Sequence, residues 1–244
     1  TTNIDSLNAT AVQALSATQL RALTSTQLSN LNSTDIGELN ATNVQALTAT
    51  QVAALGATNF AALVDTQVQA LSATQLKGVS TTQLSNLTST DVGEFTATQV
   101  GALTSTQLNS LGATNIGALA TTQVQALTVT QIRALSADAL AALDTTHVNQ
   151  LNATQIGGLT ATQVANLTST EFGELVTTQI DAFTKTQLGA LSTTNLNVLD
   201  TTQAQGLNAT QLSGLTITQV SNLSTTAFGE LTTTQVNGLS ATQL

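Results

Sequence analysis

Proline, cysteine, methionine, tryptophan and tyrosine are all missing from this chain of 244 residues, and only 7% of its residues are charged. Without cysteine, the chain can form no disulfide, thiolate nucleophile or cysteine-ligated metal site. Thirteen acidic residues against four basic ones exclude the clusters of Lys and Arg that bind nucleic acid or an anionic membrane surface. No apolar run approaches the length of a membrane span, so we expect no membrane insertion.

The chain consists of repeats of one eight-residue phrase. Residues 16–31 contain two of these repeats, SATQLRAL and TSTQLSNL. Numbered 1 to 8 from Ser16, position 5 is apolar at all 31 of its occurrences, with Ala204 the weakest, and position 8 is always Leu, Val or Phe. Position 3 is Thr at 30 of 31 places and position 4 is Gln at 19 of 31. Because no insertion breaks the register, we predict a single continuous solenoid of about 30 repeats over residues 1–244, a segment of a longer array.

The eight-residue period predicts a very short helix in each repeat. In a continuous helix, eight residues overshoot two turns by about 80°, so the apolar positions would drift around the helix. A half-buried strand would need apolar and polar residues to alternate, and the spacing of three and five residues does not provide this. Ser16–Gln19 and Thr24–Gln27 match the capping box, and positions 5 and 8 then share one helix face. We therefore expect an all-α superhelix of short capped helices in which the hydroxyl of position 3 bonds to a neighbouring repeat. The alternative is a β-solenoid with threonine ladders.

A longer period of seven repeats is also present. Arg21, Lys77 and Arg133 are spaced by it, and D-[IV]-G-E recurs at 35–38 and 91–94. Duplication of a seven-repeat block explains this spacing. So does a superhelix with about 3.3 to 3.5 repeats per turn, in which seven repeats complete two turns. The sequence leaves both explanations open.

Three acidic pairs are the best candidates for a metal site, because calcium binds several carboxylate oxygens. They are Asp35 and Glu38, Asp91 and Glu94, and Glu171 and Glu174. A structural role is favoured, since acids in a first helical turn stabilise the helix and an acid at position 4 can replace Gln in the capping box. The spacing lacks the dense ligands of a calcium loop, so we predict no metal and no cofactor.

No catalytic group is apparent. His147 is the single histidine, occupies position 4 and has no second ligand or partner, so it is interpreted as a tolerated surface substitution. No base is present to activate one particular hydroxyl among so many Ser and Thr, and the chain is predicted not to be an enzyme. Eight N-x-[ST] sequons occur, and several of their Asn residues fall at the expected caps.

The phrase L-[ST]-x-T-Q-[VLI]-x-A resembles repeat tracts of large bacterial secreted and surface proteins of the adhesin-like type. The resemblance implies an extracellular or cell-surface spacer, stalk or fibre. Self-association end to end or side by side is compatible with that role. The alternative is a binding module that uses the Thr rows or the superhelical groove for ice, glycan or protein. Interfaces usually concentrate aromatics and Arg, and here the aromatics are five Phe at apolar repeat positions, which favours the structural role.

Overall fold

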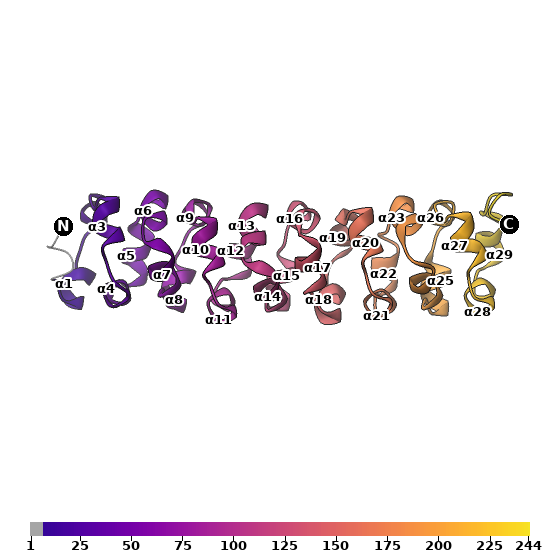
Figure 1. The fold of residues 1–244 in the computed structure, drawn as a ribbon, viewed down its shortest axis with the longest axis horizontal. Helices are drawn as coiled ribbons and strands as arrows, with labels where there is room; N and C mark the ends of the chain where they lie inside the picture. Colours follow the sequence, from indigo (N-terminus) through magenta and orange to yellow (C-terminus); the bar gives the residue numbers. More distant parts are fainter. Residues whose placement is uncertain (1–6) are drawn as a thin grey trace. The chain divides into compact units, whose positions relative to one another are not determined.

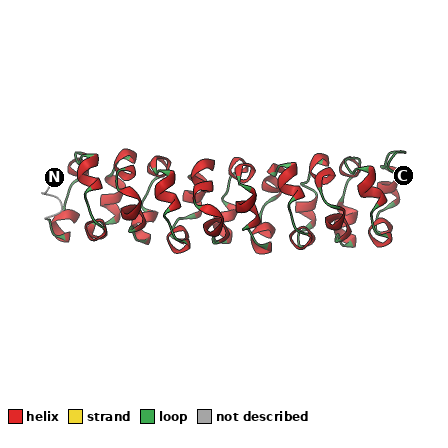
Figure 2. Cartoon of the chain, viewed as in Figure 1, coloured by secondary structure: helices red, strands yellow, loops and turns green. Residues whose placement is uncertain are grey.

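A computed structural model describes residues 7–244 and contains only helices, turns and loops in that range (Figure 2). Within it, 29 helices make up 65% of the structure. The prediction of an all-α solenoid is therefore confirmed, and the β-solenoid alternative is wrong. The chain divides between Ala126 and Leu127 into two units, each described separately below.

The helices of both units are four to six residues long. Those of unit 1 are α1 (Ala9–Gln13), α2 (Ala17–Arg21), α3 (Ser25–Ser29), α4 (Ser33–Glu38), α5 (Ala41–Ala46), α6 (Ala49–Ala53), α7 (Gly56–Ala61), α8 (Asp65–Gln69), α9 (Ala73–Gly78), α10 (Thr81–Ser85), α11 (Ser89–Gly93), α12 (Ala97–Ala102), α13 (Ser105–Ser110), α14 (Gly112–Gly117) and α15 (Thr121–Gln125). Those of unit 2 are α16 (Val129–Ala134), α17 (Ala137–Ala141), α18 (Thr145–Gln150), α19 (Ala153–Gly158), α20 (Ala161–Ala165), α21 (Ser169–Gly173), α22 (Thr177–Ile180), α23 (Lys185–Ala190), α24 (Thr193–Asn197), α25 (Thr201–Gly206), α26 (Ala209–Leu212), α27 (Ile217–Ser221), α28 (Thr225–Gly229) and α29 (Thr233–Asn237).

Most helices begin at a capping box, and all of them end within two turns. In α2, the Ser16 hydroxyl accepts the Gln19 N–H at 3.3 Å, and Gln19 Oε1 accepts the Ser16 N–H at 2.9 Å. After α5, Leu47 and Thr48 both have extended backbone, with ψ of 146° and 160°, and so separate one helix from the next. Helices this short are unstable alone, so the caps and tertiary packing must hold them.

The core consists of the side chains at positions 5 and 8. Leu76 and Val79, in the repeat around α9, are only 0% and 3% exposed. In unit 2, Phe172 and Phe183 pack with ring centroids 5.7 Å apart. Burying each such side chain contributes about 1.5–3 kcal/mol, and every repeat contributes two.

Within each unit, a helix packs mainly on the third helix along the chain. Unit 1 has the contacts α3·α6, α6·α9 and α9·α12, and unit 2 has α20·α23, α23·α26 and α26·α29. In Figure 1, α4, α8 and α11 follow one another along the lower edge of unit 1, by a step of four helices and then a step of three. Side-chain hydrogen bonds between turns join residues 25 to 31 apart, so one turn takes between three and four repeats. Helices α4 and α11, which are seven repeats apart, lie on the same edge of unit 1 (Figure 1), as the geometric interpretation of the longer period requires.

Candidate functional surfaces

The glutamine at position 4 joins successive turns of the superhelix. Gln75 uses Oε1 in its own capping box, where it accepts the Ser72 N–H at 2.8 Å. Its Nε2 donates to the carbonyls of Val44 and Leu47, both at 2.8 Å. The side chain is 4% exposed, so these bonds are shielded from water. One residue therefore caps its own helix and holds the preceding turn.

The same bonds recur through both units. In unit 2, Gln187 donates to the carbonyls of Ile156 and Leu159 at 2.9 and 2.8 Å. Asn at position 4 is one methylene shorter, and Asn195 bonds the position 8 carbonyl of Leu167, at 2.8 Å. These buried amides thus find partners, as they must to avoid a desolvation penalty.

The threonine row at position 3 faces outward. These side chains are exposed in every described repeat, for example at Thr42, Thr98 and Thr210. We expected the Thr hydroxyl to bond to a neighbouring repeat, and the position 4 amide has that role instead. The reason is geometric: position 3 lies in the first turn of each helix, on the side away from positions 5 and 8. The most regular residue of the phrase is therefore a surface residue.

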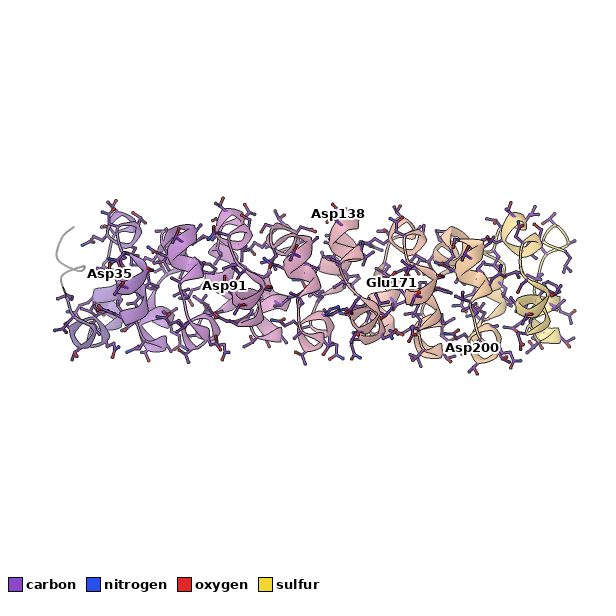
Figure 3. The ribbon with its side chains drawn as sticks, turned by 60° about the horizontal axis from the view of Figure 1, so that its bottom comes forward. Asp35, Asp91, Asp138, Glu171 and Asp200 are labelled. Carbon is purple, nitrogen blue, oxygen red and sulfur yellow. The ribbon has the colours of Figure 1, made fainter. Side chains whose placement is uncertain are left out.

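The acids at position 4 serve as caps. Asp35 Oδ2 accepts the Asn32 N–H at 2.8 Å, and Glu171 Oε2 accepts the Thr168 N–H at 2.7 Å. Asp91 has the same role in α11. The capping role predicted for these acids is confirmed. Among residues 7–244, no group of three or more His, Cys, Asp or Glu side chains is placed to hold a metal ion. Figure 3 shows Asp35 and Asp91 at a similar height in unit 1.

The remaining acids of the three pairs, Glu38, Glu94 and Glu174, stand at position 7. Glu94 has a perturbed environment. The pKa of Glu94 is raised to about 7, mainly because its carboxyl is partly buried. A hydrogen bond with Asp65 and the negative charges of Asp65 and Asp91 raise it further. Its Oε2 is buried and without a hydrogen-bond partner. The structure therefore brings Glu94 close to an acid that lies outside the three sequence pairs.

His147 is not the surface substitution that the sequence suggested. The residue is 8% exposed, and its Nδ1 accepts the backbone N–H of Asp144 at 3.3 Å. The backbone N–H of His147 in turn donates to Asp144 Oδ1 at 3.0 Å. That bond from the His147 N–H lowers the pKa of Asp144. The histidine thus takes the buried capping place of Gln. Position 4 was expected at a helix surface, whereas the superhelix buries it against another turn.

The sequons divide into two structural classes. Asn8, Asn32, Asn40, Asn152 and Asn208 are helix N-caps whose side chains accept backbone N–H groups. Asn86, Asn166 and Asn222 stand at position 7 and are exposed.

Residues 116–152 match the family model of the ALTTAQ repeat. The matched segment contains ALTVTQ at Ala126–Gln131, whose last residue is a buried position 4 glutamine. The match supports the assignment of this chain as a repeat protein. A search of curated proteins finds none that matches the chain. Among residues 7–244, no helix combines the length and apolarity that crossing a bilayer requires.

Proposed function

We propose that the chain is a structural repeat protein of an extracellular or cell-surface assembly, acting as a spacer, a stalk or a fibre component without catalytic activity. The observation that carries this proposal is the ladder of position 4 amides. Most of these amides bond to a repeat about one turn away, as Gln75 does, so units can be added without altering the contacts already made. The resemblance of the phrase to adhesin-like repeat tracts supports the surface location.

An insertion experiment tests the spacer role. Duplicating residues 33–88 adds seven repeats, which is two turns, and keeps the repeat in register. We expect the maximum dimension of the full chain in X-ray scattering to rise by a similar increment for each added block, with unchanged helicity. A matched insertion of six and a half repeats breaks the register and should lower the helicity. An unchanged maximum dimension after duplication would contradict the spacer role.

Fibre formation is tested separately, by sedimentation of the unmodified chain over a range of concentrations. Assembly into long species would favour a fibre component, and a constant sedimentation coefficient would favour a spacer. Immunolabelling of intact cells of the source organism tests the location. Labelling only after permeabilisation would contradict a surface role.

The exposed Thr row supports a second candidate, a binding module for ice, glycan or protein. Thr42 and Thr98 are seven repeats apart and therefore lie on the same side of unit 1. If the row binds ice or glycan, replacing both with valine should abolish ice recrystallisation inhibition or glycan-array signal while leaving helicity unchanged. If the wild-type chain is inactive in both assays, binding of ice and binding of glycan are both excluded.

A further inference from the structure

Successive turns approach each other closely where position 7 meets position 2 of the repeat three places earlier in the chain. A Cβ added to Gly78 would lie 2.9 Å from the Cβ of Ala49, and one on Gly238 would lie 2.9 Å from the Cβ of Ala209. Both pairs have the same separation along the chain. Side chains at such a pair are held together by the superhelix, whatever their chemistry.

Asp65 and Glu94 occupy one of these pairs. Asp65 is at position 2 and Glu94 is at position 7, with the same separation as Ala49 and Gly78. Their side chains are hydrogen bonded, which requires one of the two carboxyls to carry a proton. The Oε2 atom of Glu94 is buried and accepts no hydrogen bond from a donor group, so an ionised Glu94 would have an unsatisfied, desolvated charge.

We propose that Asp65 and Glu94 form a proton-sharing clasp between two turns of unit 1, in which Glu94 donates to the Asp65 carboxylate, and that loss of this proton loosens the two turns. Two ionised carboxylates at this contact repel each other and lose their hydrogen bond. The clasp makes the inter-turn packing of this part of unit 1 sensitive to pH.

The helices around Glu94 supply no counter-charge that would remove the effect. Asp65 comes from α8 and Asp91 from α11 itself, and both are acidic. α14, which packs on α11, and the neighbouring helices α10 and α12 have no ionisable side chain. The direction of the pH dependence follows from the raised pKa of Glu94. The folded chain binds this proton more tightly than the unfolded chain, so the clasp contributes most below pH 4.5 and its contribution falls as the pH rises toward about 7.

The chain provides matched controls at the equivalent places. Glu174 is also at position 7, and its position 2 partner in the preceding turn is Thr145. Glu230 is paired in the same way with Thr201. Because Thr cannot share a proton in this way, E174Q should leave the clasp intact.

The experiment is a pH titration of the full chain labelled with ¹³C at the glutamate carboxyls, which gives five signals. We expect one midpoint near pH 7, absent in E94Q, shifted to lower pH in D65N and unchanged in E174Q. The proposal is overturned if Glu94 titrates together with the other glutamates, or if D65N leaves its midpoint in place.

Thermal unfolding of the same variants gives a second readout. The wild-type Tm should fall more between pH 5 and pH 8 than the Tm of E94Q, and E174Q should follow the wild type. Parallel curves for wild type and E94Q would show that the contact does not respond to the proton, which contradicts the clasp.

Discussion

Gly158 faces Val129 across two successive turns of unit 2, so closely that a Cβ on Gly158 would lie 2.5 Å from Val129 Cγ1. The two residues stand at positions 7 and 2 of their repeats. Lys185 and Gly214 form the same arrangement, in which a large position 2 residue is matched by glycine. Alanines occupy both places of another such pair, at 153 and 182. In the pairs with Val129 and Lys185, the large position 2 side chain fits because position 7 is glycine.

Size complementarity at this contact predicts that G158A destabilises unit 2 by about 1–3 kcal/mol, because the added methyl group overlaps Val129. The double variant V129A/G158A should recover most of the loss, since it recreates an Ala–Ala pair. Urea unfolding followed by circular dichroism measures both. G229A is the control, because a Cβ there meets nothing within 4 Å. Failure of V129A to rescue G158A would refute the pairwise explanation.

Replacing a position 4 Gln with Glu separates the contribution of the inter-turn hydrogen bond to stability from the contribution of the capping box. Q75E keeps an oxygen for the Ser72 N–H but removes the donors to the Val44 and Leu47 carbonyls. We expect a loss of about 2–4 kcal/mol at pH 8, because buried carbonyls lose their partners and a carboxylate is buried. The loss should shrink at acidic pH, where the protonated carboxyl can donate again. Equal losses at pH 4 and pH 8 would argue against this explanation.

The reverse exchange should stabilise the chain. Glu171 is a cap at position 4, where most repeats have Gln. E171Q keeps the cap and supplies an amide for the carbonyls of Leu140 and Leu143, which stand at positions 5 and 8 of the repeat in the preceding turn. We expect a gain of about 1 kcal/mol in the free energy of unfolding, measured by urea titration. An unchanged midpoint would show that the new amide makes no net bond to these carbonyls.

One missing cap can be restored. Val176 is the N-cap of α22, has no side-chain acceptor and is 55% exposed, although Gln179 still accepts its N–H at 3.0 Å. V176T should stabilise unit 2 by about 1 kcal/mol, because Thr can accept the N–H of Gln179. I217T is the control, since Ile217 is similarly exposed but occupies no cap. A comparable gain in I217T would indicate a general benefit of polarity rather than capping.

Glycine is required at two helix starts in unit 1. Gly56 and Gly112 have φ of +76° and +81°, in the region where other residues are strained. We therefore expect G112A to cost about 1–2 kcal/mol, measured as a lower Tm. G93A is the matched control, because a Cβ there meets nothing within 4 Å and φ is not positive. A loss in G93A as large as that in G112A would contradict the conformational reason.

The octapeptide sequence by itself determined the local structure. The capping box and the three-residue spacing of positions 5 and 8 depend on neighbours within one repeat, so they predict the short helices, the apolar core and the caps made by Asp35, Asp91 and Glu171. Only the tertiary structure decided the contacts between repeats, since those join residues 25 to 31 apart. For that reason the sequence indicated only a capping role for the position 4 glutamine, and it placed His147 at the surface. The superhelical turn buries position 4, turns the Thr row outward and brings Asp65 against Glu94.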